Sequence, residues 1–166
     1  MQAMPKLRTV KLVGDMNVHP LVREATTAPI FLKCTAQLPS RVRRLDLFAV
    51  KLEGDDGDVL ANMLEAHSDD LVVVSLSEVT LDSLLAWKRV LEILHSIEII
   101  RLELAWPQYV GPESEVFEYQ LPMGPHTRLE RKGMGIGNVD KGYVEATRAF
   151  VKPVLEIILQ SVESLT

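Results

Sequence analysis

The sequence predicts an α/β fold in which parallel strands alternate with helices along one domain, residues 1–166. Three observations favour this fold. A strand-like pattern returns at nearly constant spacing, a helix-like pattern follows most of these strands, and the composition is globular, with 47% hydrophobic and 25% charged residues. Aromatic residues make up only 5% of the chain, so we expect an aliphatic core.

The recurring pattern is an apolar residue, two spacers, a second apolar residue, one spacer and a third apolar residue. It begins at Leu7, Val42, Leu71 and Ile99, so successive copies start 35, 29 and 28 residues apart. Alternation within each copy is typical of a strand that buries one face. The spacing predicts repeats near 7–41, 42–70, 71–98 and 99–105, with parallel strands in sequence order at 7–12, 42–47, 71–76 and 99–104.

The segments between these strands predict helices, with Asp58 before one helix and Asp82 or Ser83 before the next as capping residues. The stretch 106–142 holds four of the nine prolines and six of the nine glycines, and we expect an irregular insertion there. Residues 143–162 have a helical period and predict a C-terminal helix that kinks or restarts at Pro153.

This pattern resembles the leucine-rich repeat family, in its longer form with a true helix in each unit, over about residues 7–105. That form is the ribonuclease-inhibitor-like horseshoe, also found in F-box proteins. The resemblance implies a solenoid whose strands line a concave, partner-binding face, and it raises the recognition part of an F-box-type receptor as one role. The family often has Asn or Cys at the ninth position of the motif, where this chain has Asp15, Val50, Val79 and Pro107.

The two ends of the chain predict that it is a piece, or an unusually short relative, of a longer repeat protein. Repeat arrays need polar caps, yet this chain begins almost directly on a strand and ends, at 162–166, on what reads as the start of another copy. The structural alternative is an ordinary α/β domain with parallel strands.

The residues between the apolar positions of each strand should point away from the core, because successive strand side chains face opposite ways. In register they form three rows that mix arginine, acidic and aromatic side chains, and arginine and aromatic residues often dominate binding energy at protein interfaces. The rows are Thr9, Arg44, Val73 and Arg101; Lys11, Asp46, Ser75 and Glu103; and Val13, Phe48, Ser77 and Ala105 with Trp106 beyond. The candidate partner-binding residues are Lys11, Arg44, Asp46, Phe48, Arg101, Glu103 and Trp106.

Several functions lack support in the sequence. A net charge of −5 argues against a nucleic-acid partner, and no apolar run is long enough to span a membrane. The single cysteine, Cys34, cannot form an internal disulfide; we expect it to be buried in an intracellular protein. The glycine-rich stretch 133–138 lacks the last glycine of a dinucleotide-binding loop and is interpreted as a flexible hinge. We find no catalytic motif and expect neither a metal nor a cofactor.

The sequence therefore predicts a non-catalytic protein-binding module. The alternative function is a small α/β enzyme or ligand-binding domain with its site in the loops after the strands, formed by Asp15, Asn17, Glu78, Thr80 and the 106–142 loop. Strand order separates the two, because a repeat array keeps sequence order and a doubly wound sheet reverses it.

Overall fold

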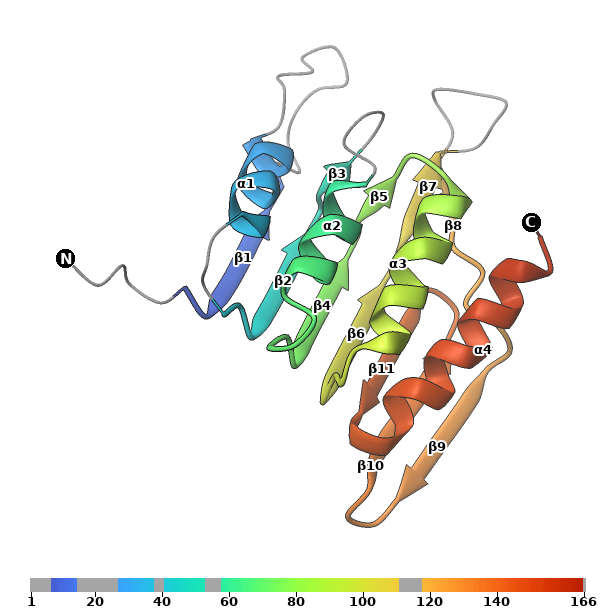
Figure 1. Cartoon of the computed structure of the whole chain (residues 1–166). Coiled ribbons are helices and arrows are strands. Elements are labelled where there is room, and N and C mark those ends of the chain that lie inside the picture. Colours follow the sequence, from blue (N-terminus) through green and yellow to red (C-terminus); the bar gives the residue numbers. More distant parts are fainter. Residues whose placement is uncertain (1–6, 15–26, 38–40, 53–57, 111–117, 166) are drawn as a thin grey trace.

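The computed structural model describes residues 7–14, 27–37, 41–52, 58–110 and 118–165. They form a mixed α/β fold with a largely parallel main sheet, a smaller sheet and four α-helices (Figure 1). The predicted α/β class is confirmed at this level. None of the helices in the described ranges has both the length and the apolar character needed to cross a bilayer.

Within the described ranges the main sheet has seven strands, and its first four are parallel and adjacent in sequence order, as predicted. Among these four parallel strands the order has no reversal of the kind that marks a doubly wound sheet. Three antiparallel strands then complete the sheet. In spatial order the strands are β1 (Thr9–Val13), β2 (Arg44–Phe48), β4 (Val73–Ser77), β6 (Arg101–Ala105), β11 (Tyr143–Thr147), β10 (Gly135–Asp140) and β9 (Thr127–Arg131).

Three of the parallel strands are each followed by a residue in the left-handed backbone conformation, at which the chain turns into the smaller sheet. Ala49, Glu78 and Trp106 have φ angles of 52°, 52° and 50°. The N–H of Ala49 donates to the carbonyl oxygen of Ser77 at 2.9 Å, and the N–H of Glu78 donates to that of Ala105 at 2.7 Å. The corners at Ala49 and Glu78 are thus each tied to the next parallel strand. The smaller sheet has the order β3 (Lys51–Leu52), β5 (Thr80–Leu81), β7 (Gln108–Val110) and β8 (Glu118–Gln120).

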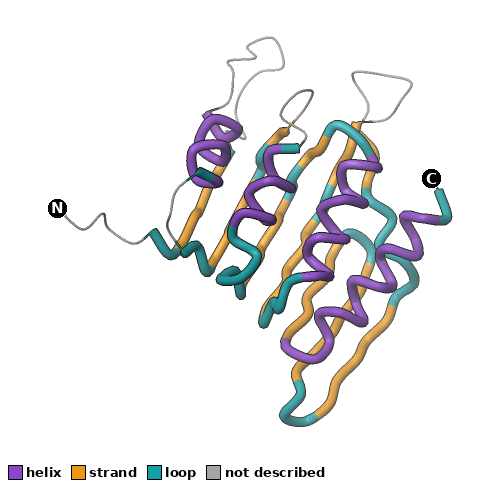
Figure 2. The backbone as a smooth tube through the Cα atoms, in the orientation of Figure 1, coloured by secondary structure: helices purple, strands orange, loops and turns teal. Residues whose placement is uncertain are grey.

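All four helices cover the same face of the main sheet (Figures 1 and 2). They are α1 (Thr27–Ala36), α2 (Val59–Ala66), α3 (Leu84–Ser96) and α4 (Val151–Glu163), the last preceded by the 3₁₀ turn η2 (Arg148–Phe150). The alternating apolar residues of the strands are buried beneath them, including Leu45, Leu47, Val74, Leu76, Leu102 and Leu104. Val50 and Val79, at the ninth motif position, are also buried.

The capping predictions have different outcomes. The side chain of Ser83 accepts a hydrogen bond from the backbone N–H of Ala86 at 3.1 Å and so caps α3. Asp58 precedes α2, but its side chain makes no capping bond. Its carboxylate instead accepts from Arg89 of α3 at 2.6 Å, which ties the two helices together.

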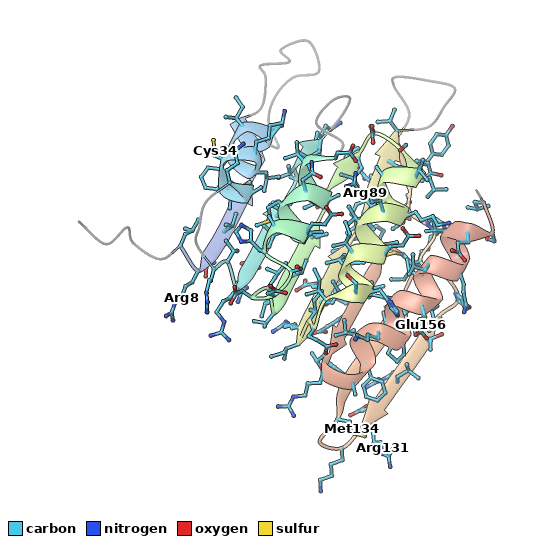
Figure 3. All side chains as sticks on the ribbon, viewed as in Figure 1. Arg8, Cys34, Arg89, Arg131, Met134 and Glu156 are labelled. Atoms are coloured by element: carbon cyan, nitrogen blue, oxygen red, sulfur yellow. The ribbon has the colours of Figure 1, made fainter. Side chains whose placement is uncertain are left out.

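Two expectations from the sequence, the single helix and the burial of Cys34, differ from the structure, whereas Pro153 lies at the start of a helix, which is one of its two predicted outcomes. Residues 143–162 do not form one helix, because β11 occupies the first part and α4 begins only at Val151. Pro153 lies in the first turn of α4, where its missing N–H costs nothing. Cys34 is exposed on α1 rather than buried (Figure 3).

The 106–142 segment is not irregular where the structure describes it, because it contributes β7, β8, β9 and β10. The glycines expected to form a hinge belong to the β9–β10 hairpin, where Gly133 has a φ of 80°. Gly137 allows close packing, since a Cβ there would lie 2.9 Å from the Cβ of Phe150. The glycines therefore serve a turn and a close approach.

Candidate functional site

The face of the main sheet opposite the helices, called here the open face, is covered by none of the helices described (Figure 2). The pairing of β1, β2, β4 and β6 brings together the three rows that the sequence predicts. Each row continues onto β11 through the antiparallel β6–β11 pairing. The rows on these five strands are Thr9, Arg44, Val73, Arg101 and Thr147; Lys11, Asp46, Ser75, Glu103 and Glu145; and Val13, Phe48, Ser77, Ala105 and Tyr143.

The three rows differ in chemistry. The first holds the exposed guanidinium groups of Arg44 and Arg101 and is called the arginine row. The second is the acidic row, which has three carboxylates and one lysine. The third, the apolar row, has an exposed valine at Val13 and aromatic rings at its second and fifth positions. Because neighbouring rows are two residues apart along each strand, they lie about 6–7 Å from one another. The open face therefore carries three bands that run across the strands, one of arginines, one of acidic residues and one of apolar residues.

An ion pair links the arginine and acidic rows on β2. Arg44 Nε lies 2.7 Å from Asp46 Oδ2, and the two side chains are 54% and 18% exposed. This hydrogen bond raises the pKa of Arg44 above its usual value. The other carboxylate oxygen, Asp46 Oδ1, is buried and has no hydrogen-bond partner among the described residues. A buried acceptor without a donor costs free energy.

A second group of charges lies where β6 meets β11. Arg101 Nη2 lies 3.4 Å from Glu145 Oε1, and the hydroxyl of Tyr143 donates to Glu145 Oε2 at 3.4 Å. Burial, and then the negative charges of Glu145 and Glu103, raise the pKa of Tyr143. The phenol is therefore kept in its neutral, hydrogen-bonding form. Sequence reasoning missed Tyr143 and Glu145 because it assigned their segment to a helix, although the alternation of Val144 and Ala146 was the signal for a strand.

Trp106 lies just past the apolar row. Its backbone N–H donates to the carbonyl oxygen of Gly142 at 2.6 Å. The six-membered ring of its indole packs against the Cα of Gly142, leaving no room for a side chain there. The residue remains 47% exposed. Trp106 therefore presents a large apolar surface beside the end of β11, next to Tyr143.

The turn that contains Gly142 borders a pocket of about 330 Å³ at one end of the antiparallel strands. Within it, His126 Nδ1 and Asp140 Oδ1 are 3.5 Å apart, and both side chains are mostly exposed. The pocket is lined by Gln120, Leu121, Pro122, Met123, Gly124, His126, Asp140, Lys141 and Gly142.

The predicted partner-binding residues lie together, with Lys11, Arg44, Asp46, Phe48, Arg101 and Glu103 on the open face and Trp106 at its margin. Their role in binding stays a prediction. Ala105 is in its predicted row but is buried.

The alternative loop site is less well assembled. Asp15 and Asn17 lie outside the described residues. Thr80 is buried and donates to Gln108 Oε1 at 3.3 Å, and Glu78 forms a backbone corner. In the described part of the chain, no three His, Cys, Asp or Glu side chains are grouped as a metal site requires.

Comparison with known proteins adds no assignment. No protein-family model matches the sequence, and neither a curated protein nor a solved structure matches the chain.

Proposed function

We propose that this chain is a non-catalytic protein-binding module of the leucine-rich-repeat type and that its partner binds the open face. One observation carries the proposal: four parallel strands present equivalent positions, in register, on a face that the described helices leave uncovered. Repeat folds use a broad, rigid sheet of this kind to add one row of contacts per unit.

The repeated backbone supports the leucine-rich-repeat assignment. Gly14, Ala49, Glu78 and Trp106 share the eighth position of the motif, and the N–H of each donates to the neighbouring chain segment. Gly14 is required at its place, because a Cβ would overlap the carbonyl oxygen of Ala49. Buried valines at the ninth position replace the family's side-chain ladder, so this array is held there by apolar contact. The F-box-type recognition role and the intracellular location rest on the sequence alone.

The banding of the open face defines the partner's chemistry. A complementary surface has carboxylates opposite Arg44 and Arg101, a hydrogen-bond donor or cation opposite Asp46 and Glu103, and apolar groups opposite the third row. Intramolecular ion pairs already hold Arg44 and Arg101 in position, which lowers the entropic cost of ordering them on binding.

The pocket beside Gly142 is the one observation that favours the alternative, a ligand-binding domain with a site in the 106–142 segment. The contact between His126 and Asp140 that lines it is largely exposed to solvent. Burial is what most strongly tunes such groups for catalysis, so we favour the binding module.

The first prediction tests the open face with a partner identified by cross-linking and then purified. Arg44→Ala and Trp106→Ala should each weaken binding by more than about 1 kcal/mol, roughly a fivefold rise in Kd, because arginine and tryptophan commonly dominate interface energies. Isothermal titration calorimetry measures the Kd, and circular dichroism checks folding.

The matched control is Glu92→Ala on the exposed side of α3, which should leave the Kd unchanged. If Glu92→Ala abolishes binding while both open-face variants bind normally, the helices carry the function and the proposal is wrong.

A further inference from the structure

Strand β9 forms one edge of the main sheet, and β10 is its only partner among the described strands (Figure 1). The backbone N–H and C=O groups on its outer side are therefore available to another strand, as at any sheet edge. Figure 3 shows Arg131 at the end of this strand, where the hairpin projects from the body of the molecule. Leu129, at the middle of β9, faces the helix side and is only partly buried against the core.

The sequence of β9 is complementary to itself. If two copies align antiparallel with Leu129 opposite Leu129, Arg128 of each copy lies opposite Glu130 of the other. Both residues face the open side, because they pair with Asn138 and Ile136 of β10. Directly opposed side chains on antiparallel strands interact, and opposite charges there are stabilising. Within one copy, Arg128 Nη2 already lies 3.2 Å from Glu130 Oε2, and these side chains are 73% and 60% exposed.

We propose that two copies of this chain pair antiparallel through β9, about a two-fold axis perpendicular to the sheet, and so join their main sheets into one. The helices of both copies then lie on the same side. The two open faces become continuous, and the four side chains at 128 and 130 alternate in charge across the seam.

Charge at a sheet edge ordinarily prevents pairing with another strand. Here the order of the charges selects one register instead. A shift that centres the pair on residue 128 or 130 places like charges opposite each other, whereas centring on Leu129 neutralises both contacts. The other edge strand, β1, lacks this property, because self-pairing about its middle residue places Lys11 against Lys11. Self-complementarity thus distinguishes β9 from the other edge of the same sheet.

Sedimentation equilibrium of the 166-residue chain, from about 1 to 200 μM, tests the pairing. We expect a monomer–dimer equilibrium for the unaltered chain. Glu130→Arg and Arg128→Glu should each raise the dimer dissociation constant at least about tenfold, since each creates two like-charge contacts per dimer. The double variant Arg128→Glu/Glu130→Arg restores opposite charges in the same register, and its dissociation constant should return to near that of the unaltered chain.

Hydrogen exchange gives a second reading that does not depend on any variant. Amides of Thr127–Arg131 should become more protected as the protein concentration rises, while those of β1 should not. A chain that stays monomeric over the whole range overturns the proposal. So does a dimer that the single variants leave intact, a double variant as weak as the single ones, or concentration-dependent protection at another strand alone. Circular dichroism and urea midpoints establish that each variant is folded.

Discussion

Pairs of residues two positions apart on the same strand recur at the surface of this protein. Arg44 bonds to Asp46 on β2, and Tyr143 bonds to Glu145 on β11. Residues i and i+2 of a strand share a face, so each pair needs no tertiary contact to form. The ion pair between Arg44 and Asp46 lies near the surface, where such pairs contribute little to stability. Their effect is to hold polar groups in defined orientations on the open face.

The core beneath these residues is where single side chains govern stability. Leu76 is fully buried in β4, whereas Ser75 beside it points to the open face. Leu76→Ala should lower the free energy of unfolding by about 2–5 kcal/mol, because it leaves a cavity in a close-packed core. Ser75→Ala should change it by no more than about 0.5 kcal/mol. Urea denaturation measures both, and equal midpoints for the two variants would contradict the alternation in β4.

At the scale of elements, a strand was predictable where its alternation of buried and exposed residues does not merge with the helical period of a neighbouring helix. The template starting at Val42, Leu71 and Ile99 gave β2, β4 and β6 in the correct register. β11 was not predictable in this way, because its two buried residues merge with the helical period of α4, which begins four residues after the strand ends. The glycines of 106–142 predict an irregular insertion and a hinge, because composition alone does not distinguish flexible chain from a turn or a close approach.

The left-handed corners were also missed, because alanine, glutamate and tryptophan give no sequence signal for a positive φ. Non-glycine residues pay about 1–2 kcal/mol for that conformation. Ala49→Gly should therefore stabilise the protein by up to about 1 kcal/mol. The same substitution inside α3, Ala86→Gly, should destabilise it by about 1 kcal/mol, since glycine is a poor helix former. Thermal unfolding of the two variants should shift in opposite directions; shifts of the same sign would exclude strain at the corner.

For the whole molecule, the open face is a consequence of placing every helix on one side. The order of the parallel strands follows from the spacing of the repeats. The continuation of the sheet beyond β6 does not follow from that spacing, because the antiparallel strands carry no copy of the motif. The candidate rows on β1 to β6 were accordingly found from sequence, and their extension onto β11 was not. Both parts share one continuous apolar core, which runs from Val10 on β1 to Val162 on α4.

That continuity predicts that the parallel and antiparallel parts unfold together. Gly137 of β10 lies against Phe150 and Val154, and a Cβ there would come within 3.0 Å of the Val154 Cγ2 atom. Gly137→Ala should destabilise the antiparallel part by about 1–3 kcal/mol through overpacking.

In a two-state protein the loss appears equally at every probe. The chain has a second tryptophan, so the variants are compared in a Trp106→Phe background. The fluorescence of Trp87, which is buried in α3, and the far-ultraviolet circular dichroism should therefore shift to the same lower urea midpoint. Asn138→Ala, on the open side of β10, serves as the control and should shift neither. A fluorescence transition that keeps its original midpoint while the dichroism transition moves would mean that β9, β10 and α4 fold as a separate unit.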